Sequence, residues 1–150
     1  MLRDVVEDDL DAIFEQHRDP ESVEMAKVPS RDRKGFDAHW QRVLAGPTNV
    51  AKVIDVDGVV AGTALSWEQD GRRLVGYWLA REYWGRGLAT QALAQLVAEL
   101  PQRPLHAWVV TTNAGSIRVL QKCGFVEVGR HAEHDQHSGE TVEELLYELR

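Results

Sequence analysis

Two Asp-Gly pairs constrain the fold of this chain more than any other feature of its sequence. The pairs Asp57-Gly58 and Asp70-Gly71 separate three apolar runs, at residues 50–56, 59–67 and 74–80. Asp-Gly between apolar runs favours a two-residue β-hairpin turn, in which both central residues adopt a positive φ. The middle of the chain is therefore predicted to form an antiparallel meander of three strands.

The hydrophobic period changes after the meander. Past a glycine-rich turn, residues 88–100 place apolar side chains at helical spacing, and Pro101 and Pro104 end the helix. Residues 105–110 form a short apolar run typical of a buried strand. Because a strand–helix–strand unit brings the second strand back in the direction of the first, the strands at 74–80 and 105–110 should be parallel. The prediction is an α+β fold with a mixed, mostly antiparallel sheet.

The remaining segments complete this architecture. The pattern predicts a first strand, three further helices and a closing hairpin, at residues 2–6, 8–17, 36–44, 114–123, 125–128 and 143–149. Residues 21–34 are polar and are expected to be irregular. No repeat or linker divides the 150 residues, so residues 1–150 are predicted to form a single domain with helices on both faces of the sheet.

Composition excludes several classes of function. The net charge of -7 argues against a protein that grips nucleic-acid phosphates, which usually requires a basic face. No apolar run approaches the length of a membrane span, and the N-terminal segment is acidic. Cys123 is the only cysteine, so no internal disulfide forms. We expect a cytoplasmic protein, a monomer or a homodimer, with no nucleic-acid or membrane partner.

The glycine-rich turn is the first candidate binding site. It reads Tyr83-Trp84-Gly85-Arg86-Gly87-Leu88-Ala89-Thr90 and lies where a predicted strand ends and a helix begins. Free N–H groups and the positive end of the helix dipole favour a pyrophosphate there, and the glycines allow a close approach of the backbone. A plain glycine turn without a ligand is the alternative, because such turns are common.

A second stretch lies beside the first in the predicted topology. Asn113 follows the parallel partner strand and is placed to cap the next helix, with Ser116 on the first turn of that helix. Both residues should face the crevice at the carboxyl ends of the strands, where open sheets bind ligands.

Together, the two stretches resemble the GNAT superfamily of N-acetyltransferases. The order of elements matches that family over nearly the whole chain. The family's acetyl-CoA signature, Gln/Arg-x-x-Gly-x-Gly/Ala, appears as Trp84-x-x-Gly87-x-Ala89, with Trp in place of Gln or Arg. The sequence GYWLAREYWGRGLAT, followed later by NAGSIRVLQKCGF, is similar to sequences of the branch that includes ribosomal-protein N-terminal acetyltransferases.

The resemblance implies an acetyl-CoA-dependent N-acetyltransferase and assigns roles to particular residues. The main chain of an arm-binding segment just before the glycine-rich turn would pair with the pantetheine arm of the donor. Within this segment, the Leu79 N–H would polarise the thioester carbonyl. Asn113 would bond the pantetheine or the acceptor. The remaining main-chain groups would hold the pyrophosphate, with a side-chain contact from Arg86. The arm-binding segment comprises Leu79, Ala80 and Arg81, and the pyrophosphate loop comprises Gly85, Arg86, Gly87, Leu88, Ala89 and Thr90.

The chemistry of this chain departs from the family pattern. Many relatives carry, seven residues after the Asn, a tyrosine that acts as the general acid for the leaving thiolate. In this chain that position is Leu120. Ser116 is the nearest replacement and would orient a water or hydrogen-bond the sulfur. The strand at residues 74–80 has no Asp, Glu or His, so Glu68 and His106 are the candidate bases, with a structural or solvated role as the alternative for each. Direct attack by the amine is expected, with Cys123 packed in the core.

Several further residues invite a functional interpretation. No metal site is expected from His131, His134 and His137, because in an extended strand the middle one faces away from the other two. Of the five tryptophans, two are the candidates for ligand contact. A basic cluster in the polar segment has solvated surface as its ordinary interpretation, whereas the family resemblance implies that this segment walls the acceptor pocket. These residues are Trp67 and Trp84, and Arg31, Arg33 and Lys34.

Two function classes remain open at this point. The leading prediction is acetyl transfer to a primary amine, either a protein α-amine or a small-molecule amine. The alternative is a non-catalytic acyl-CoA-binding or sensing module, for which the missing tyrosine and the absence of a clear base argue.

Overall fold

Both Asp-Gly turns form as predicted. Asp57 and Asp70 each have a φ of 53°, and the glycines that follow them also have positive φ values. The turns join strands β2 (Val50–Val56), β3 (Val59–Gln69) and β4 (Arg72–Leu79) into the antiparallel meander. The computed structural model describes residues 1–28, 30–134 and 139–150.

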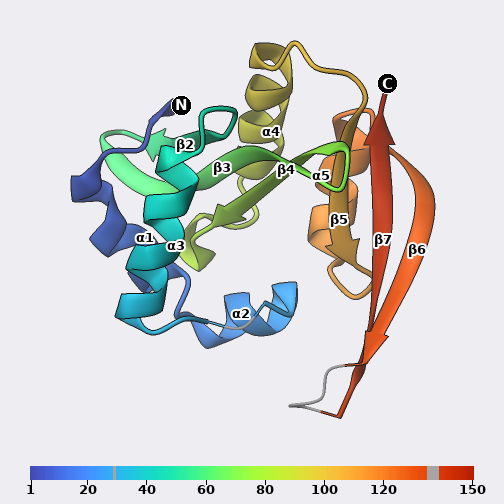
Figure 1. The fold of residues 1–150 in the computed structure, drawn as a ribbon, viewed down its shortest axis with the longest axis horizontal. Helices are drawn as coiled ribbons and strands as arrows, with labels where there is room; N and C mark the ends of the chain where they lie inside the picture. The colour runs from blue at the N-terminus through green and yellow to red at the C-terminus, as the bar shows by residue number, and fades with distance from the viewer. Residues whose placement is uncertain (29, 135–138) are drawn as a thin grey trace.

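One seven-stranded sheet contains the meander. Helix α4 (Leu88–Glu99) connects β4 to β5 (Leu105–Val110), which runs parallel to it. Antiparallel neighbours flank this unit, namely β1 (Leu2–Asp4) beside β2, and β7 (Thr141–Leu149) and β6 (Val126–His134) beyond β5. The sheet order is β1-β2-β3-β4-β5-β7-β6 (Figure 1), which confirms the predicted mixed α+β architecture.

Helices cover the sheet on two faces and bury two apolar clusters. On one face, α4 and α5 (Ala114–Lys122) pack against the strands around Leu93, Leu96 and Leu120. On the other face, α1 (Leu10–Gln16) and α3 (Arg33–Ala45) enclose a smaller cluster around Ile13 and Trp40. Each fully buried side chain of this size contributes about 1.5–3 kcal/mol. None of the helices in the described ranges combines the length and apolar character needed to cross a membrane.

The polar segment at residues 21–34 is not wholly irregular, contrary to expectation. It contains helix α2 (Pro20–Ala26), whose N-cap residue Asp19 accepts hydrogen bonds from the backbone N–H and the hydroxyl of Ser22 at 3.3 and 2.8 Å. Pro at the first helical position fixes a helical φ. Helix α3 also begins three residues earlier than predicted, because Asp32 caps it by accepting from the Gly35 N–H at 2.7 Å.

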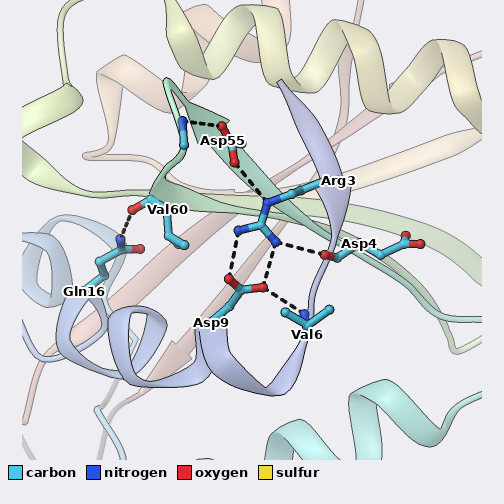
Figure 2. A network of polar contacts seen from close by, with 8 residues as sticks. Arg3, Asp4, Val6, Asp9, Gln16, Asp55 and Val60 are labelled. Atoms are coloured by element: carbon cyan, nitrogen blue, oxygen red, sulfur yellow. Dashed lines mark hydrogen bonds and ion pairs between the residues drawn. The ribbon is translucent and has the colours of Figure 1, made fainter.

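The N-terminal strand is fastened by an ionic network around Arg3 (Figure 2). The Arg3 guanidinium donates to both carboxylate oxygens of Asp9, each at 2.9 Å, and to Asp55 on β2 at 3.0 Å. Asp9 lies in the short 3-10 helix η1 (Glu7–Asp9) and also accepts from the Val6 N–H. The hydrogen bonds from Arg3 lower the pKa values of both carboxyl groups. A planar guanidinium that bonds two acids in this way joins three segments at one point.

Candidate active site

The site lies where two neighbouring strands part. Strands β4 and β5 pair only at Arg73 with Leu105 and at Leu74 with His106. Beyond these two pairs the strands diverge, while each keeps its antiparallel partner on the other side. The parting leaves main-chain groups on the inner edges of both strands without strand partners.

Leu79 is the residue whose main chain faces this gap. The Ala80 N–H donates to the Ala61 carbonyl of the meander at 2.8 Å. Since successive N–H groups of a strand point to opposite sides, the Leu79 N–H points away from β3 and toward β5. The Leu79 carbonyl accepts from the Trp84 indole N–H at 2.8 Å, which fixes the start of the turn that follows.

The glycine-rich turn leads from the gap into α4 through the 3-10 helix η2 (Arg81–Tyr83). Gly85 and Gly87 have φ values of 77° and 75°, and no atom lies within 4 Å of where a Cβ would stand on either residue. Gly87 is the N-cap of α4 and supplies no side-chain cap. The first N–H groups of this helix are therefore available to an anion, with the helix dipole behind them.

A cavity of about 640 Å³ extends from the gap along the turn to α5. Its only charged lining residues in the described chain are Arg118 and Lys122 of α5, both basic. No role for either residue was predicted from the sequence, although they lie one helical turn apart after Asn113. Eight of the residues expected to hold the donor line the cavity: Leu79, Gly85, Gly87, Leu88, Ala89, Thr90, Asn113 and Ser116.

Three residues expected at the site lie outside this lining. Ala80 is buried, and its N–H and carbonyl are bonded within the protein, to Ala61 and Tyr83. Arg86 extends over the Tyr83 ring, with its guanidinium carbon 5.4 Å from the ring centroid. The Arg81 guanidinium pairs instead with two acids that flank the start of α2, Asp19 at 3.3 Å and Glu21 at 2.8 Å.

A hydroxyl pair lies on the wall of the cavity beside Asn113. The Asn113 side chain accepts from the Ser116 N–H at 3.2 Å and so caps α5. The Ser116 Oγ lies 2.8 Å from the Oη of Tyr77 on β4. Burial raises the pKa of Tyr77, so this phenol stays protonated at neutral pH. No sequence signal pointed to Tyr77, because a base on β4 was expected only from Asp, Glu or His.

The candidate bases do not line the cavity. Glu68 is exposed on β3. The His106 Nε2 lies 3.0 Å from the Glu148 carboxylate, and the ring is buried in the sheet. Glu68 is therefore better described as a solvated residue and His106 as a structural one than as catalytic bases. Cys123 packs against the main core near Leu120, and burial raises the pKa of its thiol, as expected of a packing residue.

Other sequence candidates take separate places in the fold. Arg33 pairs with Asp11 at 2.7 Å and Asp37 at 2.9 Å and so serves the packing of α1 against α3, while Arg31 and Lys34 are exposed. Residues 1–28, 30–134 and 139–150 contain no group of three or more side chains suited to a metal. His131 and His134 lie on β6, whereas His137 lies outside the described residues.

Comparison with known proteins identifies the family. Residues 1–126 match the family described as "Acetyltransferase (GNAT) domain". An uncharacterized N-acetyltransferase, p20, of Bacillus licheniformis is 24% identical over 161 residues, which cover 99% of this chain and 90% of the relative. The chain belongs to the GNAT acetyltransferase family, which confirms the resemblance found in its sequence. The description of that family makes the chain an acetyltransferase domain.

Solved structures share its fold at low sequence identity. A ribosomal-protein-alanine N-acetyltransferase from Brucella melitensis matches with a TM-score of 0.82 and 22% identity, covering 99% of this chain and 98% of its own. A spermidine N-acetyltransferase from Vibrio cholerae, solved with CoA and spermine, matches with a TM-score of 0.86 and 16% identity, covering 99% and 94%.

Proposed function

We propose that the protein acetylates a primary amine by direct attack of the amine on acetyl-CoA in the gap between β4 and β5. The observation that carries the proposal is the parting of these strands, beside which a free N–H group, a hydroxyl pair and a basic cavity meet. The bond formed joins the amine nitrogen to the acetyl carbon, and the bond broken is the carbon–sulfur bond of the thioester.

The cavity suits the donor in both charge and shape. In this proposal, the N–H groups at the start of α4 hold the pyrophosphate, and Arg118 and Lys122 neutralise phosphate charge. The open space beside Gly85 and Gly87 admits a phosphate close to the backbone. In a protein of net charge -7, a cavity whose described charged residues are all basic indicates an anionic ligand.

Leu79 polarises the thioester in this arrangement. Its N–H, directed into the gap, donates to the carbonyl oxygen, which gains negative charge as the amine attacks. Removing one such donor from an enzyme typically costs a factor of roughly 10²–10³ in kcat. Asn113 positions Ser116 on the opposite wall through its capping bond.

The hydroxyl pair serves the leaving group. An amine that arrives as an ammonium ion releases two protons as the amide forms; one ends on the departing sulfur and the other in solvent. Ser116 and Tyr77 line the cavity together, and the Ser116 hydroxyl hydrogen-bonds the sulfur while Tyr77 supports it. A phenol, with a reference pKa of about 10, is a weaker acid than a thiol at about 8.5, so the pair stabilises the thiolate rather than protonating it outright.

The proposed acceptor is a primary amine, which covers both a protein α-amine and a small-molecule amine. Relatives of the same fold carry names that differ on this point, ribosomal-protein alanine in one and spermidine in another. An α-amine, with a reference pKa of about 7.7–8.0, needs less help to lose its proton than an alkyl amine at about 10.4. The absence of a carboxylate or histidine from β4 modestly favours an easily deprotonated acceptor.

Calorimetric titration with acetyl-CoA tests where the donor binds. Gly87→Trp fills the open space at the start of α4 and is expected to abolish micromolar binding. Gly58→Trp is the matched control, because Gly58 also has a positive φ, 83°, and no atom within 4 Å of an added Cβ, yet lies in the β2–β3 turn. Both variants carry similar backbone strain, about 1 kcal/mol. A difference between them in acetyl-CoA binding therefore indicates a binding site at the glycine-rich turn.

Turnover then separates the two function classes. Release of CoA thiol in the presence of any amine supports acetyl transfer. Binding of acetyl-CoA without turnover across a broad set of amines and N-terminal peptides would favour the non-catalytic module. Equal binding by wild type, Gly87→Trp and Gly58→Trp would remove the donor from the glycine-rich turn.

A further inference from the structure

A second cavity of about 290 Å³ adjoins the donor cavity at the gap. The two cavities share part of their lining, including Tyr77, Trp78, Asn113 and Ser116. On β4, Val75, Tyr77 and Leu79 belong to the cluster under α4 and α5, so the alternate residues Gly76 and Trp78 face the side of α1 and α3. The second cavity therefore opens the gap to the opposite face of the sheet.

Three tryptophans wall this cavity, one from each of three adjacent strands: Trp67 on β3, Trp78 on β4 and Trp108 on β5. The Trp78 indole N–H donates to the Gln16 carbonyl at 3.2 Å, which fixes that ring. The Trp67 ring lies over Gly76, where an added Cβ would come within 3.1 Å of it. Trp108 keeps 39% of its surface exposed, an unusual exposure for so large an apolar side chain.

One carboxylate faces these rings without a partner. Glu144 on β7 lies opposite Val110 of β5 and lines the cavity, and within the described residues its side chain makes no hydrogen bond or ion pair. Lys27 also lines the cavity, but its ammonium is paired with Glu24 and, at 3.6 Å, with Glu140. His131 is the cross-strand neighbour of Glu144 on β6, and its ring centroid lies 6.3 Å from that of Trp108.

We infer that this cavity is the acceptor site and that it selects a compact primary amine with a single positive charge and an apolar or aromatic body. Glu144 holds the ammonium group, and the indoles of Trp67, Trp78 and Trp108 pack against the body. Indole faces attract cations as well as apolar groups, so they favour an ammonium near Glu144. The inference rests on the proposed acetyltransferase function and deepens it by naming the acceptor class.

Charge and size disfavour the other acceptors. A polyamine would bring additional ammonium groups toward the cationic Lys27, and the described lining offers them no second free carboxylate. A peptide acceptor would fit only its first residues into about 290 Å³. A carboxylate is a much weaker base than an amine, so Glu144 binds the ammonium ion rather than deprotonating it. One proton passes to solvent, and the neutral nitrogen then attacks the thioester.

The test compares three acceptors on four proteins. The acceptors are 2-phenylethylamine, spermidine and a short Ala-initiated peptide; the proteins are wild type, Glu144→Gln, Trp108→Ala and Glu143→Gln. The last is the matched control, since Glu143 is the adjacent residue of β7, faces the other side of the sheet and pairs with Arg130 at 2.7 Å. The readouts are KM and kcat for each amine, Kd for acetyl-CoA, and binding of 2-phenylethylamine to the CoA-loaded protein by tryptophan fluorescence.

We expect 2-phenylethylamine to have the highest kcat/KM of the three acceptors, because its fit in charge and size outweighs the more easily lost proton of the peptide α-amine. Glu144→Gln should raise the KM and the fluorescence Kd for that amine by about tenfold or more, as loss of a charge-assisted bond predicts, with Kd for acetyl-CoA unchanged. Trp108→Ala should act in the same direction, and Glu143→Gln should match wild type.

Other results overturn the inference in distinguishable ways. An unchanged KM and Kd in Glu144→Gln, or a higher kcat/KM for spermidine or the peptide, would remove the assigned acceptor while leaving acetyl transfer in place. Failure of wild type to bind acetyl-CoA or to acetylate any amine would instead remove the proposed function. In that case the fluorescence titration, carried out on the free protein, still reports whether Glu144 holds an ammonium ion.

Discussion

Tyr77 and Ser116 stand 39 positions apart in the sequence and meet across the cavity at 2.8 Å. Tyr77 comes from a strand and Ser116 from the first turn of the helix after the neighbouring strand. Their contact depends on how far β4 and β5 have parted at that level. If the pair acts as a unit on the leaving sulfur, removing either hydroxyl should remove most of what both supply.

Ser116→Ala is therefore expected to lower kcat by roughly tenfold to hundredfold, with a smaller change in Kd for acetyl-CoA. Tyr77→Phe should lower kcat similarly, and the double variant should lose little more than either single one, because the effects of coupled groups are not additive. Tyr147→Phe is the control, since Tyr147 lies on β7 and lines neither cavity. Steady-state kinetics and calorimetry on the four proteins make the comparison. Additive losses would show that the hydroxyls act separately, and wild-type kcat in Ser116→Ala would remove Ser116 from the mechanism.

Sequence reasoning located some of the site residues and missed others for physical reasons. Asn113 and Ser116 were found because helix capping has a local signature. The roles of Tyr77, Arg118 and Lys122 depend on which cavity their side chains enter, and that depends on the parting of the strands, which no local pattern encodes.

At the scale of single elements, local turn chemistry decided what was predictable. Strands β2 and β5 match their predicted bounds, because Asp-Gly and Pro mark their ends. Helix α2 was missed because it lies at the start of a mostly polar segment and lacks the regular apolar spacing that α1, a helix of the same length, shows. Its N-cap, Asp19, followed by Pro20, was the signal that could have revealed it.

Helix α1 is expected to make the stability of the protein depend on pH through His17. Burial, with smaller contributions from Arg31 and His39, lowers the pKa of His17 to about 4, and its Nε2 has no hydrogen-bond partner among the described residues. Between about pH 6.5 and pH 4 the unfolded chain binds more protons at this residue than the folded protein. Stability is therefore lost as the pH falls through this window, by about 2 kcal/mol between pH 8 and pH 5.

His17→Phe should remove this part of the pH dependence, because the ring still packs against Trp78 and Phe36 but no longer titrates. Urea unfolding at about pH 8 and pH 5 measures it, with the difference between variant and wild type larger at the lower pH. His134→Phe, an exposed position on β6, should keep the wild-type dependence. The same pH dependence in wild type and His17→Phe would mean that His17 protonates normally in the folded protein.

For the whole molecule, the sheet consists of two parts that share little. Strands β1 to β4 form one part and β5, β7 and β6 the other, and the register between the parts consists of two residue pairs. The apolar cluster under α4 and α5 and the hydrogen bond between Tyr77 and Ser116 also connect the two parts. A donor seated in the gap as proposed adds main-chain bonds across the parting.

Acetyl-CoA at a hundred times its Kd should therefore raise the free energy of unfolding by about 2.7 kcal/mol. Hydrogen exchange should slow most at the amides lining the gap, around Leu79 and along the start of α4. Mass spectrometry of the free and donor-bound protein, with Gly87→Trp as the control that does not bind, measures both the site and the size of this protection. Uniform protection over the whole sheet, or none near Leu79, would contradict the proposed position of the arm.

The two-pair joint between β4 and β5 also has a mechanical consequence. We expect such a joint to act as a hinge whose stiffness depends on what occupies the wedge beside it. Seated as proposed, the donor stiffens the hinge during the chemical step, and the departure of CoA loosens it again. Product release and the softening of the molecule are then one event, so a change that tightens the hinge should slow turnover even where it leaves every reacting group in place.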